Sequence, residues 1–207
     1  MMDGPFVFVD IDTPRDFLEE SGALFVPGSR AIVANLARLT RTAKSAEIPV
    51  LATACCHLPD DAELSRFPPH CMAGADGQRR IKETECVEST VLGVDDRLTG
   101  DLPRHLTLYK REFDVFSRPD AGALVERLGA SRPRFVVYGV ATDYCVRAAV
   151  EGLLARGQRV AVVVDAVRAI DPEAESRLLS DWAGRGALLV MTDAVCQAVP
   201  TLAASAR

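Results

Sequence analysis

Six short apolar runs constrain the fold of this chain more than any other feature of its sequence. Each run is mainly apolar along its whole length and does not alternate with polar residues. Continuous apolar segments of this length are typical of strands that are covered on both faces, as the strands of a parallel sheet are. The runs occupy residues 6–9, 48–53, 107–109, 135–138, 160–164 and 187–191.

The segments between several of these runs have the apolar spacing of amphipathic helices. Ser29 stands where an N-cap is expected, before apolar residues at positions 32, 33, 36 and 39. A second apolar stripe begins at Thr142 and ends at Gly157, and a third helix begins at Asp171, which proline follows. This order predicts an α/β three-layer Rossmann-like fold with a six-stranded, mainly parallel sheet, formed by residues 1–207 as one domain.

The charge of the chain limits the partners that we expect for it. Its 207 residues include 24 Lys and Arg and 29 Asp and Glu, which gives a net charge of −5. Binding to nucleic acid or to an anionic membrane requires a basic face, so we expect neither partner. No apolar run is long enough to cross a bilayer, and the first residues lack the features of a signal peptide. We therefore expect a cytoplasmic protein with reduced cysteines.

Polar and nucleophilic residues follow four of the expected strands directly. They are Asp10, the segment 55–57, Lys110 and the segment 141–145. Ligand sites in open α/β sheets lie at the carboxyl ends of the strands. We therefore expect these residues to meet at one edge of the sheet and to form a site.

Cys145 is the strongest candidate nucleophile in this set. If the helix begins at Thr142, Cys145 lies in its first turn, where the helix dipole favours a thiolate. The alternative is a small buried hydrophobic residue, which is the usual environment of a single cysteine. Taken alone, Asp10 also fits a helix cap or turn, and Lys110 fits a solvated surface charge.

A second cluster lies between residues 55 and 100, a region with little periodicity that is long for a connection. His57 and His70 are two of the three histidines of the chain, and Cys55, Cys71 and several carboxylates lie near them in the sequence. These side chains are ligands for zinc or iron, although their spacing matches no compact zinc-finger pattern. A metal or substrate loop is one interpretation of this region, and a polar loop without metal is the other.

Two segments carry a resemblance to a known family. Residues 138–146 read Tyr-Gly-Val-Ala-Thr-Asp-Tyr-Cys-Val and resemble the nucleophile segment of the isochorismatase-like cysteine hydrolases. Residues 67–74 read Phe-Pro-Pro-His-Cys-Met-Ala-Gly and are similar to a segment of the nicotinamidases within that superfamily. The first strand ending in Asp10, the pair at 109–110 and the segment 190–193 fit the same family.

The resemblance implies a catalytic triad and an oxyanion hole. Cys145 would be the nucleophile, Asp10 the general base and Lys110 the third member. The bond between Val140 and Ala141 falls where the family has a cis peptide, which would direct the Ala141 and Cys145 amides at a developing oxyanion.

The resemblance also implies a divalent metal as cofactor. His57 and His70 fall on ligand positions, and Glu63 falls where the family has a variable ligand. Cys55 stands where the family usually has an aspartate, and this exchange keeps a ligand but makes the site softer, which favours zinc over iron or manganese.

Three aromatic residues are implied as substrate contacts, namely Phe17, Phe67 and Tyr144. Phe67 stands where nicotinamidases commonly have a tryptophan. The segment between Asp10 and Phe17 is longer and more charged than the family pattern, so we expect Phe17 to be displaced.

These observations predict a metal-dependent cysteine amidohydrolase that converts nicotinamide into nicotinate and ammonia through a thioester. We also expect a small amide as its partner and a homo-oligomeric assembly.

Three alternatives stay open. The same triad would serve another small amide or imide. The segment Asp10-Ile11-Asp12-Thr13 also resembles the Asp-x-Asp of haloacid-dehalogenase-type phosphatases. The altered metal loop would also suit a non-catalytic binding protein.

Overall fold

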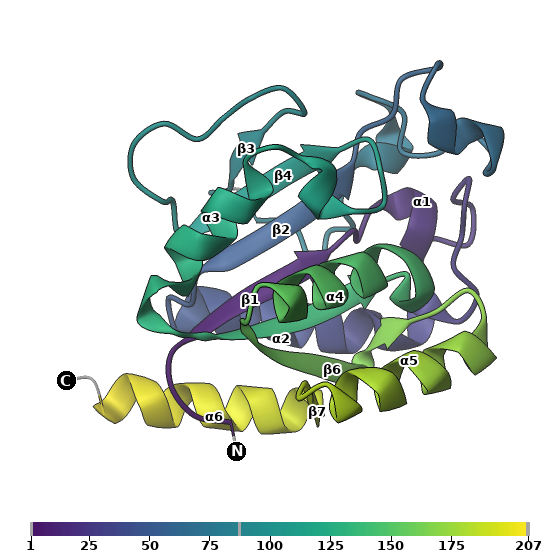
Figure 1. Cartoon of the computed structure of the whole chain (residues 1–207). Coiled ribbons are helices and arrows are strands. Elements are labelled where there is room, and N and C mark those ends of the chain that lie inside the picture. The colour runs from purple at the N-terminus through teal and green to yellow at the C-terminus, as the bar shows by residue number, and fades with distance from the viewer. Residues whose placement is uncertain (1, 87, 206–207) are drawn as a thin grey trace.

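The computed structural model describes residues 2–86 and 88–205, and a parallel sheet of seven strands forms its centre (Figure 1). Every strand pairs with its neighbours in parallel, in the order β3-β4-β2-β1-β5-β6-β7. The strands are β1 (Phe6–Ile11), β2 (Val50–Cys55), β3 (Thr90–Leu92), β4 (His105–Lys110), β5 (Arg134–Val140), β6 (Arg159–Arg168) and β7 (Leu188–Val190).

Helices cover both faces of this sheet, which confirms the predicted fold class. On one face lie α1 (Arg15–Leu18), α2 (Val33–Ser45) and α6 (Thr192–Ser205). On the other lie α3 (Ala121–Leu128), α4 (Arg147–Ala155) and α5 (Pro172–Gly184). Shorter turns are η1 (Ser29–Ile32), η2 (Ala62–Ser65), η3 (Asp76–Gln78), η4 (Val115–Ser117), η5 (Gly129–Ser131) and η6 (Thr142–Val146), of which η6 is a π-helical turn.

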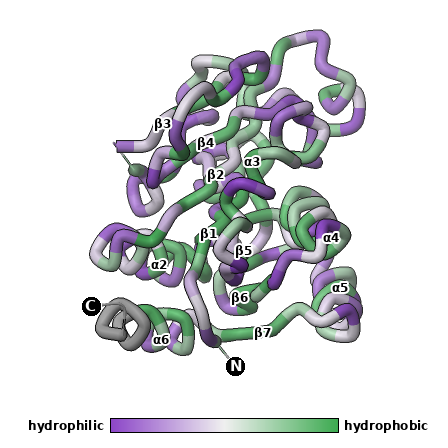
Figure 2. Tube along the Cα trace, turned by 60° about the vertical axis from the view of Figure 1, so that its left-hand side comes forward, coloured by the Kyte–Doolittle hydropathy of each residue, from purple (hydrophilic) through white to green (hydrophobic). Residues whose placement is uncertain are grey.

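The side chains of β1 explain why the sheet needs a helix layer on each face. All six residues of β1 are buried, and alternate residues enter opposite cores. Phe8 packs with Leu36 and Leu39 on the α2 face, whereas Val9 packs in the core that contains Trp182 on the α5 face. Figure 2 shows hydrophobic residues along the central strands and hydrophilic ones mainly on the outer segments.

The expected helices form, but two of the expected caps do not. The Asp171 side chain accepts a hydrogen bond from the Glu173 amide, which confirms the cap of α5. Ser29 donates to the Phe17 carbonyl instead of capping, and Thr142 donates to Glu175 while Ala141 precedes the turn. Both hydroxyls therefore form a hydrogen bond that connects their turn to another segment of the chain.

The expectation of six strands is corrected to seven. The additional strand, β3, has three residues and pairs with β4 at the edge of the sheet. Its Val91 side chain is 48% exposed, so the strand lacks the continuous apolar run that marks the others. Among residues 2–86 and 88–205, the structure has no helix with the length and apolar character that membrane crossing requires.

Candidate active site

Three of the expected side chains meet at the carboxyl edge of the sheet. Cys55 ends β2, Lys110 ends β4 beside it, and Cys145 lies in the η6 turn that follows β5. The Lys110 Nζ atom lies 3.2 Å from the Cys55 Sγ atom and 3.5 Å from the Cys145 Sγ atom. Lys110 is only 1% exposed, so it is not the solvated surface charge of the alternative interpretation.

The backbone that carries Cys145 has the expected cis peptide bond between Val140 and Ala141. Ala141 then accepts hydrogen bonds from the Tyr144 and Val146 amides, which closes the η6 turn. This turn brings Cys145 back over the end of the sheet, where Lys110 contacts it.

The carboxylate in this cluster is Asp12, not the predicted Asp10. The Asp12 Oδ2 atom lies 2.8 Å from the Lys110 Nζ atom. Thr53 donates a 2.7 Å hydrogen bond to the Asp12 Oδ1 atom and accepts one of 3.2 Å from the Asp12 amide. Asp12 has a φ of 40° and follows the last residue of β1. The left-handed turn therefore separates Asp12 from the alternation of the strand.

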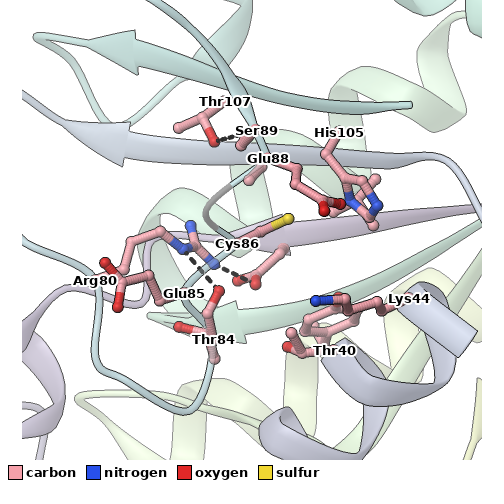
Figure 3. Close-up of a pocket in the computed structure, with 14 residues that line it drawn as sticks. Thr40, Lys44, Arg80, Thr84, Glu85, Cys86, Glu88, Ser89, His105 and Thr107 are labelled. Carbon is pink, nitrogen blue, oxygen red and sulfur yellow. Dashed lines mark hydrogen bonds and ion pairs between the residues drawn. The ribbon is translucent and has the colours of Figure 1, made fainter. Parts of the chain in front are cut away.

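Asp10 lies in a different environment, and the structure does not bring it to Cys145. It follows Phe6 and Phe8 on the α2 face of β1, where it pairs with Arg80 and accepts a 3.3 Å hydrogen bond from Thr13. Its carboxylate lines a separate cavity of about 100 Å³, in which Arg80 bonds to the Thr84 carbonyl (Figure 3). Burial raises the pKa of Asp10 despite Arg80.

The same shift of two positions corrects the expectation for Phe17. The segment from Asp12 to Phe17 is two residues shorter than the segment from Asp10 to Phe17. With Asp12 as the reference residue, the chain therefore departs less from the segment length of the family pattern. Phe17 is not displaced, because it lines the same pocket as Cys145.

Lys110 and the two thiols form one electrostatic unit with Asp12. Burial opposes the charge on Lys110, but Asp12, Cys145 and Cys55 outweigh burial and raise the Lys110 pKa well above its ordinary value. The hydrogen bond between Cys145 and Cys55 lowers the pKa of Cys55 to about 6 and raises that of Cys145. The direction of the pKa shift of Cys145 is therefore opposite to the one that its position in the first helical turn predicted.

A metal-type group of His57, Glu63 and His70 lies beside this unit. One ligand atom from each residue lies within 4.8 Å of the other two. The Nε2 atoms of both histidines and the Oε2 atom of Glu63 are buried and have no hydrogen-bond partner among the described residues. Buried polar atoms without partners are costly, so their convergence fits a bound cation.

The hydrogen bonds of the two Nδ1 atoms leave the Nε2 atoms of both histidines free to bind a metal. His70 Nδ1 lies 2.8 Å from the Pro68 carbonyl oxygen, and His57 Nδ1 lies 3.1 Å from the Asp61 carboxylate. Since both oxygens only accept, each Nδ1 carries the proton and each Nε2 presents a lone pair. Histidines that bind a metal through one ring nitrogen commonly donate the other N–H to an oxygen in this way.

Cys55 belongs to the group of Asp12 and Cys145 and lies outside the set of three metal-type ligands. Its thiol donates to the Asp12 Oδ2 atom at 3.8 Å and accepts a hydrogen bond from the Lys110 Nζ atom at 3.2 Å. The structure therefore places Cys55 with Lys110 and Cys145, and its role as a ligand stays a prediction.

An aromatic pocket connects the nucleophile to the metal-type group. Phe17, Phe67 and Tyr144 all line it, and their contact with a substrate stays a prediction. The rings of Phe67 and Tyr144 meet edge to face, with centroids 5.4 Å apart. Sequence reasoning also named Glu63, His70, Ala141 and Cys145, but it missed the remaining lining residues, because no motif surrounds them; these are Leu24, Val26, Phe113 and Ile170. The complete lining is Phe17, Leu24, Val26, Glu63, Phe67, His70, Phe113, Ala141, Tyr144, Cys145 and Ile170.

Comparison with known protein families gives one match that covers most of the chain. Residues 6–194 match the isochorismatase domain. One curated relative is 25% identical over 180 residues, covering 85% of this chain and 87% of its own length, and is described as a probable inactive nicotinamidase of Arabidopsis thaliana.

Solved structures give similar folds. A pyrazinamidase of Pyrococcus horikoshii in complex with zinc is 26% identical, with a TM-score of 0.73, over 91% of this chain and 99% of that one. An N-carbamoylsarcosine amidase of Thermoplasma acidophilum is 25% identical, with a TM-score of 0.72, over 92% and 98%.

Proposed function

Since the chain belongs to the isochorismatase family, we propose that it is a metal-dependent cysteine amidohydrolase that converts nicotinamide into nicotinate and ammonia. One observation carries the proposal. Cys145, two members of the metal-type group (Glu63 and His70) and the aromatic rings all line the same pocket. A planar aromatic amide with a ring nitrogen matches these three features together. The family also removes the phosphatase alternative, which would leave Cys145 without a role.

The proposed first half-reaction acylates Cys145. The Asp12 carboxylate lies within 4.8 Å of the Cys145 sulfur and accepts the thiol proton. The sulfur attacks the amide carbon, and the amides of Ala141 and Cys145 stabilise the oxyanion. The C–N bond then breaks, and ammonia leaves with the proton that Asp12 returns.

The second half-reaction hydrolyses the thioester. Water attacks the acyl carbon while Asp12 takes its proton, and nicotinate leaves as the Cys145 thiol forms again. Lys110 stays paired with Asp12 throughout and balances negative charge on the sulfur. When bound to His57, Glu63 and His70, a divalent metal would supply a Lewis acid for the ring nitrogen.

The aromatic pocket has to open for this substrate. With the side chains as they stand, the cavity is only about 30 Å³. We therefore expect the rings of Phe67, Phe113 and Tyr144 to move apart when an aromatic amide enters.

Comparing nicotinamide with benzamide tests the substrate assignment. The two amides have nearly the same shape, but benzamide has no ring nitrogen. We expect kcat/KM for ammonia release from nicotinamide to exceed that from benzamide by at least about 10-fold, because losing one good polar contact costs about 1.4 kcal/mol or more. Equal values for the two amides would contradict a role for the ring nitrogen.

Two alternatives are each motivated by a relative. The structure of an N-carbamoylsarcosine amidase supports hydrolysis of another small amide, and the probable inactive nicotinamidase supports a binding protein without turnover. Adding N-carbamoylsarcosine to the substrate panel tests the first. Binding of nicotinamide without ammonia release from metal-loaded protein would support the second.

Metal analysis tests the proposed ligands. We expect the purified protein to contain about one divalent ion per chain, and His57→Ala or His70→Ala to lose most of it, because each removes an unpaired ligand nitrogen. His105→Ala is the matched control, since His105 lines the other cavity and should keep the full metal content.

Cys55 needs its own variant in the same measurement. If its thiolate is a ligand, Cys55→Ser should lose metal as the histidine variants do, and Cys55→Asp should restore binding with a preference for harder ions. Full metal occupancy in Cys55→Ser would remove Cys55 from the ligand set. Metal-free wild-type protein would remove the metal site altogether.

Lys110→Met tests the electrostatic role of the buried ammonium. Removing the charge should shift the alkylation of Cys145 by iodoacetamide to higher pH, because Lys110 lowers the pKa of the sulfurs beside it. Lys44→Met is the matched control, because Lys44 is exposed at the other cavity. An unchanged alkylation profile in Lys110→Met would contradict this role.

A further inference from the structure

Two cysteines share the ammonium group of Lys110, and the mechanism proposed above uses only one of them. Lys110 Nζ contacts the Cys55 and Cys145 sulfurs at 3.2 and 3.5 Å. The two sulfurs lie within 4.8 Å of each other and within the same distance of an Asp12 oxygen. Cys55 stands where the resemblance leads one to expect a carboxylate. A thiol can be oxidised to a disulfide, and a carboxylate cannot.

The two sulfurs differ in their access to solvent. Cys145 is 6% exposed and lines the aromatic pocket. Cys55 is 1% exposed and lies behind it, and none of the other described cysteines lines that pocket. An oxidant as small as hydrogen peroxide therefore reaches Cys145 first and meets Cys55 only through it.

We propose that Cys145 and Cys55 form a redox-active dithiol, a modification site for small hydroperoxides at which Cys145 is oxidised first and Cys55 then closes a disulfide. In the first step the Cys145 sulfur attacks one peroxide oxygen. The O–O bond breaks, the sulfur becomes a sulfenic acid, and the other oxygen leaves as water with the thiol proton.

In the second step the Cys55 sulfur attacks the sulfenic sulfur. The S–S bond forms, the S–O bond breaks, and the hydroxyl leaves as a second water with the Cys55 proton. Two thiols and one peroxide thus yield one disulfide and two waters. The sulfurs have to approach to about 2 Å, which side-chain rotation over the end of the sheet has to provide.

The disulfide has two consequences for the site. It occupies the Cys145 sulfur, so the oxidised protein cannot form a thioester. It also protects that sulfur from further oxidation to the irreversible sulfinic and sulfonic acids. A dithiol reductant such as dithiothreitol should therefore restore the nucleophile completely.

Peptide mapping by mass spectrometry tests the proposal on the metal-loaded wild-type protein. After one equivalent of hydrogen peroxide we expect a disulfide-linked peptide pair containing Cys55 and Cys145, with the other four of the six cysteines still alkylatable. Dithiothreitol should return both to the thiol form. Sulfinic acid on Cys145 without the linked pair, or a pair that contains Cys71, would overturn the proposal.

Two variants sharpen the mapping. Cys55→Ser should convert the reversible product into sulfinic acid on Cys145, because no thiol remains beside it. Cys56→Ser, the neighbouring cysteine, should behave like wild type. This readout follows mass and not turnover, so it stands or fails independently of the proposed nicotinamidase activity. A linked pair in an inactive protein would contradict only that activity.

Discussion

Cys145→Ala should release no measurable ammonia from nicotinamide, with kcat lowered on the order of 10⁴-fold or more. The alanine lacks the atom that forms the thioester, and no other cysteine lines the aromatic pocket among the described residues. The fold should survive, because the change removes one sulfur at the wall of a cavity and introduces no new contact.

The thermal unfolding midpoint and the metal content of Cys145→Ala are the controls. Both should match wild type, since the metal-type group does not include Cys145. Activity that persists in a folded, metal-loaded Cys145→Ala protein would show that amide hydrolysis proceeds without covalent catalysis by this residue.

Asp12→Asn should lose both activity and stability. The amide keeps the size of the carboxylate and tolerates the left-handed φ, but it cannot accept the thiol proton, so kcat should fall about 10²- to 10⁴-fold. The same change leaves the buried Lys110 without its counter-charge, which costs about 3–5 kcal/mol of unfolding free energy. Steady-state kinetics and chemical denaturation measure the two effects separately.

Asp10→Asn is the matched control, because Asp10 is also a buried carboxylate with a cationic partner. Its variant should be less stable, since Arg80 loses its carboxylate, but kcat should stay within a few-fold of wild type. The reverse outcome, in which Asp10→Asn is inactive and Asp12→Asn is active, would restore Asp10 as the base and contradict the geometry.

The apolar runs predicted the fold because they are the buried strands themselves. Each of the six runs overlaps an observed strand, and only β3 was missed. Three partly exposed residues at the edge of a sheet leave no periodic signal, and pairing with β4 alone defines them as a strand. Capping differed at Ser29 and Thr142, where the hydroxyls bond to distant segments that the sequence does not identify.

The positions of site residues could be predicted from the sequence where a chemically suitable residue lies within a recognisable motif. Cys145, His57 and His70 lie where the resemblance placed them, because the motifs carry their register. The aspartate was misplaced because two carboxylates lie two residues apart at the end of β1. In the structure the two differ in backbone conformation and in partner, because Asp12 has a φ of 40° and pairs with Lys110. The segment from Asp12 to Phe17 was the signal in the sequence that favours Asp12.

Hydroxylamine partitioning on metal-loaded wild-type protein tests the central claim most directly, because a thioester on Cys145 reacts with hydroxylamine as well as with water. With nicotinamide as substrate, we expect nicotinohydroxamate to form in proportion to the hydroxylamine added, while ammonia release continues at no lower rate. Release of ammonia with nicotinate as the sole product at every hydroxylamine concentration, or no release of ammonia at all, would contradict hydrolysis through an acylated Cys145.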